Sequence, residues 1–385
     1  MFKGKKTLAA AYISMLLTEI GYGNMIILLP LYLTDELKFS VSAVGFIVAM
    51  YSVAEFLLKT PSGWLADRWG RKPVFFWSIF LVLISFLLIE FASSFWLLLF
   101  LVMLGGAGVA AIWPINVVIT ADLVPEEKRG HYLGIISMIC LAGKGIAPAI
   151  GSLAIYLTHS YHSLFLCNAV LCGLALLLVF WGMKEPERIS RQKSGGVKKL
   201  LFNYPRLWVL TIILFLQSLS IGILVPIAGL YANRVLGIDV EMIGPVLLLP
   251  VILIALMNYF TGLLSDKIGR KKPLLWGFIF MTVAFYLFPF KTSAWYLILV
   301  NGLLGLGYAL MMPAWTALVT EESPPEQRGT VLGLVGTMQV LGLAIGPILG
   351  TQLWDRLGTG APFWGGGFIL TLGTAVAFWK IRGKE

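Results

Sequence analysis

The sequence predicts an all-α integral membrane protein with twelve transmembrane helices in two pseudo-symmetric six-helix bundles. Its composition, the spacing of its apolar runs and an internal repeat predict this fold class. The chain has 385 residues, of which 58% are hydrophobic and 12% are charged, whereas soluble proteins carry about 25% charged residues. The 41 glycines suit membrane helices, where small residues let backbones approach closely.

Twelve apolar stretches meet or approach the length of about 20 residues that a helix needs to cross a bilayer. The first stretch follows a short basic segment and is too long for a signal sequence, so we interpret it as a spanning helix. The predicted spans are Leu8–Tyr32, Val41–Ser62, Pro73–Phe91, Phe95–Thr120, Tyr132–Tyr156, Leu164–Met183, Leu207–Tyr231, Ile243–Thr261, Pro273–Phe290, Trp295–Thr320, Val331–Leu353 and Phe363–Trp379.

The basic residues predict the orientation of these spans. An even number of spans places both termini on one side, and few of the 29 Lys and Arg residues lie in the loops on the other side. Those few are Lys38, Arg234, Lys291 and Arg356. Because basic residues concentrate in cytoplasmic loops, we expect a multi-pass protein of the cell (inner, cytoplasmic) membrane with both termini in the cytoplasm. We expect the net charge of +10 to contact membrane lipids rather than nucleic acid.

An internal repeat organises the chain. At one constant offset, Gly63–Lys72 aligns with Gly262–Lys271, and further Gly, Pro and Arg-Gly positions align in the same way. Parallel six-helix halves are a transporter architecture. A basic segment containing three small residues separates the halves and reads as a flexible linker. The predicted organisation is an N-terminal bundle over 1–183, a cytoplasmic linker over 184–206 and a C-terminal bundle over 207–385.

The repeated loop reads Gly-Trp-Leu-Ala-Asp-Arg-Trp-Gly-Arg-Lys in the first half and Gly-Leu-Leu-Ser-Asp-Lys-Ile-Gly-Arg-Lys in the second. With these loops the whole chain resembles the major facilitator superfamily, and in particular its twelve-helix drug/proton antiporter branch. We expect the first Gly to end a helix and permit close packing, and the second to allow a tight turn. We expect the Asp to accept hydrogen bonds from a helix N-terminus and to pair with Arg.

The resemblance implies a cytoplasmic gating motif that latches the outward-open state. In this network Asp122 pairs with Arg71 near Asp67, and Glu321 takes the equivalent place in the second half. Ion pairs suit a latch because a rigid-body movement can break them, although ordinary loop salt bridges are the alternative. The gating residues are Gly63, Asp67, Arg68, Gly70, Arg71, Asp122, Gly262, Asp266, Gly269, Arg270 and Glu321.

A second motif resembles the Gly-x-x-x-Gly-Pro-x-x-Gly pattern that antiporters of the family carry on helix 5. Its Pro would kink the helix, and its glycines would allow close packing. The helix-kink residues are Gly143, Pro148, Gly151, Gly346, Pro347 and Gly350. The first half departs from the pattern at Ala147, so helix 11 matches better. A further departure is Val102, which stands where drug/proton antiporters usually carry an Arg.

Four charges fall inside predicted spans, all in the first half: Glu19, Glu55, Lys59 and Lys144. Such charges cost at least about 2.5–3.5 kcal/mol each near the bilayer centre, so we expect them to take part in proton coupling. Because helices 1 and 5 line the central cavity in the family, we expect Glu19 and Lys144 to lie close together. Glu55 and Lys59 have the spacing of a pair on one helix face. The alternative is that Glu19–Lys144 and Glu55–Lys59 are fixed ion pairs that hold helices 1, 2 and 5 together.

Polar and adaptable apolar side chains inside the spans are candidates for substrate contact. The segment from Glu19 to Met25 also resembles helix 1 of multidrug antiporters, which carries a carboxylate followed by Asn. The candidates are Tyr22, Asn24, Trp113, Asn116, Met138, Gln217, Asn258, Asn301, Trp315 and Gln339. Each polar one could instead form a hydrogen bond between helices. The sequence has neither Cys/His metal spacing nor a Walker loop, so we expect no metal, no cofactor and no enzyme activity.

The predicted function is secondary active transport by alternating access, with proton-coupled efflux of amphipathic or lipophilic small molecules. The alternatives are a lipid or lysolipid flippase, a metabolite uptake carrier, and a transporter-like receptor without transport. The predicted partners are protons, membrane lipids and a small-molecule or lipid-like substrate. We expect the chain to be a monomer.

Overall fold

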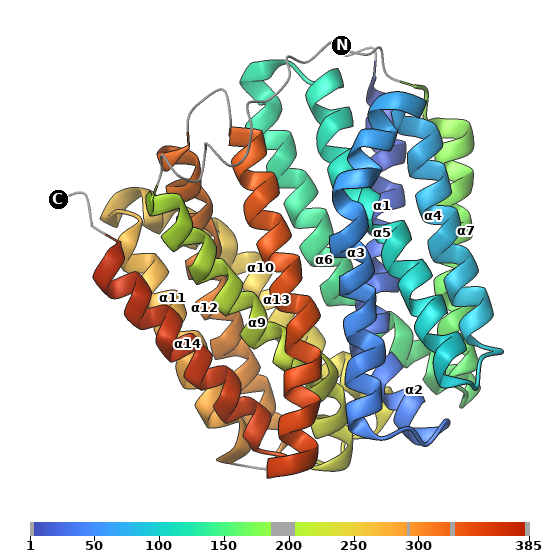
Figure 1. Cartoon of the computed structure of the whole chain (residues 1–385), viewed down its shortest axis with the longest axis vertical. Helices are drawn as coiled ribbons and strands as arrows, with labels where there is room; N and C mark the ends of the chain where they lie inside the picture. The colour runs from blue at the N-terminus through green and yellow to red at the C-terminus, as the bar shows by residue number, and fades with distance from the viewer. Residues whose placement is uncertain (1–3, 186–204, 291–292, 324–327, 382–385) are drawn as a thin grey trace. The chain divides into compact units, whose positions relative to one another are not determined.

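The computed structural model describes residues 4–185, 205–290, 293–323 and 328–381, and within these ranges all regular structure is helical (Figure 1). Some side chains inside the helices are not described. Three sequence candidates fall among these residues, so they lie outside the described side chains: Asn258, Gly262 and Asp266.

The first half begins with a broken helix. α1 (Lys5–Ile27) is capped by Leu28, and α2 (Leu29–Asp35) begins at the next residue. Pro30 lies in the first turn of α2, where a missing N–H costs least. The remaining helices are α3 (Val41–Trp69), α4 (Arg71–Ile89), α5 (Phe95–Leu123), α6 (Glu126–Thr158) and α7 (His162–Gly182).

The second half repeats this order without the break. Its helices are α9 (Pro205–Arg234), α10 (Val240–Ile268), α11 (Lys271–Leu287), α12 (Ala294–Glu322), α13 (Arg328–Leu357) and α14 (Ala361–Lys380), with a 3-10 turn, η1 (Phe288–Phe290), after α11.

The helices confirm the predicted fold class. In the described part of the chain, eleven spans are long and apolar enough to cross a membrane by length and composition, with α1 and α2 forming one of them. α10, which has 29 residues, is the twelfth long helix.

The chain packs as two compact units. One holds Met1–Ser190 with Asp239–Pro245, and the other holds Arg191–Ile238 with Val246–Glu385. In the first unit, α1 packs against α6 and α7, and α4 packs against α5 and α7. In the second unit, α9 packs against α13 and α14, and α11 packs against α12 and α14. Helices at equivalent positions in the repeat therefore pack on equivalent partners within each unit.

Glycines set the closest helix contacts. A Cβ atom built on Gly106 of α5 would collide with the Tyr51 carbonyl oxygen of α3, and one on Gly108 would collide with the Ser78 carbonyl of α4. In the second unit, a Cβ atom on Gly277 would lie 2.6 Å from the Gly307 carbonyl oxygen. The glycine content of the sequence thus reflects backbone contact between helices.

We expect Gly106→Ala to lower the stability of the folded protein by about 1–3 kcal/mol, because the added methyl group overpacks the α3–α5 contact. Gly134→Ala is the matched control, since a Cβ atom there meets nothing within 4 Å. Thermal unfolding of both purified variants tests this expectation. An equal melting temperature for the two variants would contradict the packing argument.

Candidate functional site

The glycines of the helix-kink motif bring α1 and α6 into contact. A Cβ atom on Gly143 would lie 2.7 Å from the Cβ atom of Glu19, and one on Gly151 would lie 2.5 Å from Oδ1 of Asn24. From the other side, a Cβ atom on Gly23 would lie 2.6 Å from the Cβ atom of Ala147. α6 continues through Pro148 to Thr158. The motif therefore acts here as a packing face against α1.

The second unit uses the same contact between α9 and α13. A Cβ atom on Gly342 would lie 3.0 Å from the Cβ atom of Ser218, and one on Gly346 would lie 2.5 Å from the Cα atom of Gly222. A Cβ atom on Gly350 would lie 2.5 Å from the Ile223 carbonyl oxygen. Pro347 lies inside the continuous helix α13. The two halves therefore share this helix contact.

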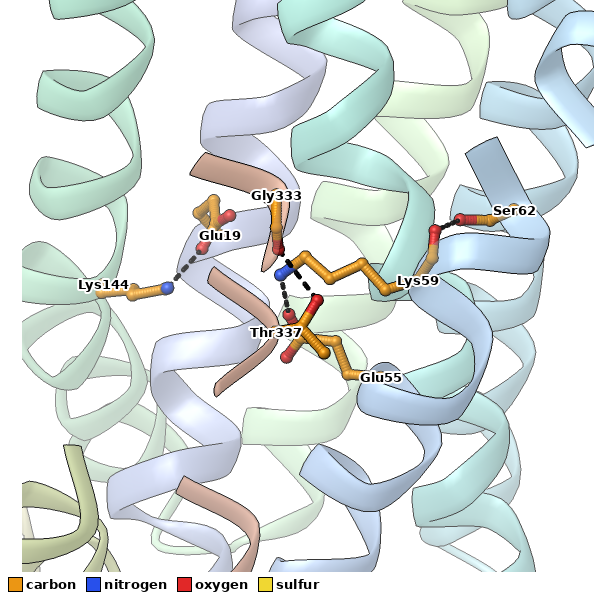
Figure 2. Close-up of polar contacts among 7 residues, drawn as sticks. All are labelled: Glu19, Glu55, Lys59, Ser62, Lys144, Gly333 and Thr337. Atoms are coloured by element: carbon orange, nitrogen blue, oxygen red, sulfur yellow. Dashed lines mark hydrogen bonds and ion pairs between the residues drawn. The ribbon is translucent and has the colours of Figure 1, made fainter. Parts of the chain in front are cut away.

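The α1–α6 contact holds an ion pair between Glu19 and Lys144. Lys144 Nζ lies 3.4 Å from Glu19 Oε2 (Figure 2). The Lys144 ammonium also lies 4.7 Å from the centre of the Tyr22 ring, which stacks on Tyr51 at 5.0 Å. The expected proximity of the two charges is therefore present. Pairing offsets part of the cost of holding each charge among apolar helices.

A second ion pair lies on α3. Lys59 Nζ donates a hydrogen bond of 3.0 Å to Glu55 Oε1 across one helical turn (Figure 2). The two side chains are 13% exposed for Glu55 and 20% for Lys59. The pairing follows from the i, i+4 spacing. A role of these four charges in proton coupling stays a prediction.

Arg71 connects three helices of the first unit at the repeated loop. Its Nε lies 3.1 Å from Asp122 Oδ2 at the end of α5, and its Nη2 lies 3.8 Å from Asp67 Oδ1 near the end of α3. The side chains of Arg71 and Asp122 are 5% and 1% exposed, whereas that of Asp67 is 74% exposed. The strong member of this network is therefore the buried Arg71–Asp122 pair.

The second unit carries a more exposed version of this pair. Arg270 Nε donates to Glu321 Oε1 at 3.2 Å, and Arg270 Nη1 donates to Ser265 Oγ at 3.3 Å. The side chains of Arg270 and Glu321 are 27% and 43% exposed. Both units thus place the loop arginine beside the acidic residue that ends the fourth helix of the half, in different solvent environments.

The first glycine of the loop does not have its expected role. α3 continues past Gly63 to Trp69, and a Cβ atom on Gly63 would meet nothing within 4 Å. The turn is made by Gly70, with a φ of 113°, and in the second unit Gly269 has a φ of 84°. Residues that carry a side chain rarely adopt such positive φ angles, so glycine is favoured at both positions. The helix therefore continues past the end of the apolar run as far as Trp69, and Gly70 caps it.

Glu185 takes the role that the sequence analysis gave to Asp67. Its carboxylate accepts hydrogen bonds from the backbone N–H groups of Arg71 at 2.7 Å and Lys72 at 2.8 Å. A carboxylate stabilises a helix N-terminus by satisfying free N–H groups and the helix dipole. Asp67 precedes the turn, its side chain is 74% exposed, and its contact is with the Arg71 guanidinium instead. Sequence reasoning missed Glu185 because it lies in the segment read as linker.

Arg68 lies outside this buried pairing. Its guanidinium carbon stacks 4.4 Å above the ring of Trp64, one turn away on α3. Both side chains are exposed. The contact is a cation–π interaction on the helix surface.

Most polar substrate candidates are buried and bonded to protein groups. Asn24 Nδ2 donates to Asn168 Oδ1 at 2.8 Å, and Trp315 Nε1 donates to the Leu210 carbonyl at 3.0 Å. Asn116 and Asn301 donate to backbone carbonyls one turn earlier, and Gln217 accepts from Ser218. Tyr22 is buried, whereas Met138, Trp113 and Gln339 keep exposed surface. Contact of any of these residues with substrate stays a prediction.

We expect the two equivalent ion pairs to differ in energetic weight. Asp122→Ala leaves the Arg71 charge buried and should destabilise the protein by about 3–5 kcal/mol. Glu321→Ala removes an exposed partner and should cost about 0–1 kcal/mol. Denaturant or thermal unfolding of the two variants checks the difference. Similar losses in both would show that burial does not govern these pairs.

We expect Glu185→Ala to destabilise the start of α4 by about 1–2 kcal/mol, because two backbone N–H groups lose their acceptor. Hydrogen exchange at the amides of Arg71 and Lys72 reports this loss directly. Glu36→Ala is the control, since Glu36 is exposed. Unchanged exchange at these two amides in Glu185→Ala would remove the capping role.

Comparison with known proteins identifies the family of this chain. The family model described as Major Facilitator Superfamily matches twice, over residues 11–254 and over residues 210–385. Multidrug resistance protein 2 of Bacillus subtilis is 24% identical over 379 residues, which cover 95% of this chain and 93% of that protein. Quinolone resistance protein NorA of Staphylococcus aureus is 23% identical over 357 residues, covering 91% and 90%.

A solved structure shows the same fold. A bacterial homolog of the human lysosomal transporter Spinster, in an inward-facing and unoccupied conformation, aligns with a TM-score of 0.79 at 15% identity. The alignment covers 97% of this chain and 95% of that chain. Together with the repeated helices and loops, these matches show that the chain is a multi-pass membrane protein belonging to the Major Facilitator Superfamily.

Proposed function

We propose that this chain exports amphipathic or lipophilic small molecules across the cell membrane by alternating access, driven by proton entry. The observation that carries the proposal is the Glu19–Lys144 pair, in which the Glu19 side chain is only 6% exposed. The names of two relatives, which refer to multidrug and quinolone resistance, also support it. A buried ionisable group within a spanning helix is a candidate for proton transfer by default.

In this proposal Glu19 is the site where proton and substrate compete. A proton neutralises the carboxylate, and a positively charged group of the substrate can also compensate it in place of Lys144. Because the two cannot occupy Glu19 together, release of one favours binding of the other. This competition gives exchange of a proton for a substrate molecule.

The loop ion pairs would supply the gate. With both termini in the cytoplasm, as the basic residues favour, the pairs Arg71–Asp122 and Arg270–Glu321 lie at the cytoplasmic ends of their units. Ion pairs and loops at such ends can re-form as rigid units move. We propose that the chain performs this cycle as a monomer.

We expect Glu19→Gln to reduce transport driven by a pH gradient to the rate of protein-free vesicles. Gln keeps the shape of the side chain but cannot release a proton. The measurement is ethidium flux in proteoliposomes with an imposed pH gradient, together with proton movement on addition of ethidium.

Glu36→Gln is the control, since it makes the same change at an exposed position outside the ion pairs. Full gradient-driven flux in a folded Glu19→Gln protein would overturn the proton role of Glu19. Transfer of labelled lipid between leaflets, without ethidium flux, would favour a lipid flippase instead.

A further inference from the structure

The Glu19–Lys144 pair offers its two charges unequally. The Lys144 side chain is 40% exposed, whereas that of Glu19 is 6% exposed. The Glu19 side chain leaves α1 directly against the backbone of α6 at Gly143, and its Oε2 points to the Lys144 ammonium (Figure 2). The accessible charge of this buried pair is therefore positive.

The face of α6 that carries the ammonium continues as uncharged surface. Leu133, Ser137, Cys140 and Lys144 follow helical spacing along this face. Each of them keeps at least part of its surface exposed. On the other side, the ammonium lies over the Tyr22 ring. A ligand that suits this surface carries a negative group on an aromatic or aliphatic body.

We propose that Lys144 is a binding site for organic anions, such as aryl sulfonates or carboxylates, and that the anion binds together with a proton on Glu19. Both the ligand anion and the Glu19 carboxylate need the same ammonium. A protonated Glu19 does not compete for it and leaves Lys144 to the ligand. By linkage, bound anion then favours bound proton to the same degree.

The sign of this coupling is opposite to that of the proposed exchange. A cationic ligand competes with the proton for Glu19, whereas an anionic ligand and the proton bind as a set. The same ion pair therefore exchanges cations against protons but carries anions with them. This second mode goes beyond the proposed function and adds proton–anion co-transport as a further activity.

The other ionisable groups near the pair do not supply this coupling. Cys140 on α6 and Tyr22 on α1 interact electrostatically with Lys144, as does Glu55 on α3. Thiol and phenol groups are neutral near pH 7, and this includes Tyr51, which stacks on Tyr22. Glu55 forms its own ion pair with Lys59 at 3.0 Å. Of the other helices packed against α1, α5 carries only Asp122, in the loop network, and α2 carries Asp35, which accepts a hydrogen bond from Tyr161. α7 carries no Asp, Glu, Lys or Arg, and its one histidine, His162, is its first residue and lies beside Glu90.

Binding of 2-naphthalenesulfonate to the purified full chain tests the proposal. This probe keeps its charge across the tested range, so any pH dependence reports on the protein. We expect its affinity to rise by about 5–150-fold, the usual coupling between two sites, as the pH falls from about 8 to about 5.5. Tetraphenylphosphonium, a cation without a titrating group, should show the opposite dependence.

Variants separate the two charges. Glu19→Gln should bind 2-naphthalenesulfonate tightly at both pH values, because the neutral side chain imitates the protonated acid. Lys144→Gln should lose this binding at both, and Lys144→Arg, which keeps the charge, should retain it. Lys6→Gln is the matched control, since Lys6 is exposed at the start of α1.

An affinity of the unmodified protein for 2-naphthalenesulfonate that does not change with pH would overturn the proposal. Retained binding in a folded Lys144→Gln protein would also overturn it. If that variant does not fold, the pH profile of Glu19→Gln still decides. Because binding is measured in detergent without a gradient, its failure is distinct from a failure of ethidium export in vesicles.

Discussion

The contact between α1 and α6 is the constraint on which the first unit depends. At Gly23, Gly143 and Gly151 the two helices come so close that an added Cβ atom would meet backbone or side-chain atoms within 3 Å and would not fit without a shift. This contact brings Lys144 of α6 to Glu19 of α1 at 3.4 Å. A wider separation would leave each charge without its partner among apolar helices, at a cost of several kcal/mol per ion. Packing and electrostatics depend on each other here. Small residues allow the two helices to come close, and the close approach allows the ion pair that offsets the cost of burying the charges.

The second unit shows that this contact does not itself need charges. Gly342 meets Ser218 where Gly143 meets Glu19, and the neighbour of Gly342 is Leu343 where Gly143 precedes Lys144. Glycines determine how closely the helices approach, and the residues beside them are free to differ. The repeat therefore preserves the same helix packing in both units, while charged residues near the middle of a span occur only in the first half of the sequence. The proposed proton coupling would therefore lie in the first unit.

The number of helices and their division into two bundles could be predicted from the sequence, because apolar run length and the repeat offset each report directly on the fold. Apolar runs report the thickness of a bilayer, and a constant offset reports duplication, so twelve helices and two equivalent bundles followed. The tight turn at Gly70 was predicted and is confirmed, but the length of α3 up to this turn was not predicted, because hydropathy marks the end of the apolar run and not of the hydrogen-bonded helix. Glu185 was missed for a related reason, since a carboxylate just after the sixth apolar run carries no periodic signal. A search for acidic residues at the ends of neighbouring helices would have found it.

Burial distinguishes the two loop networks in a way that the shared motif does not. Arg71 and Asp122 are almost fully buried, and Glu185 fixes the adjacent helix start through two short hydrogen bonds. Separating such a pair leaves charge without solvent or partner, which opposes repeated opening. Arg270 and Glu321 keep 27% and 43% of their side chains exposed, so water can replace each partner at little cost. A latch must open in every cycle. In the proposed gate the exposed pair would therefore separate at little cost, whereas separation of the buried pair would carry most of the cost of opening.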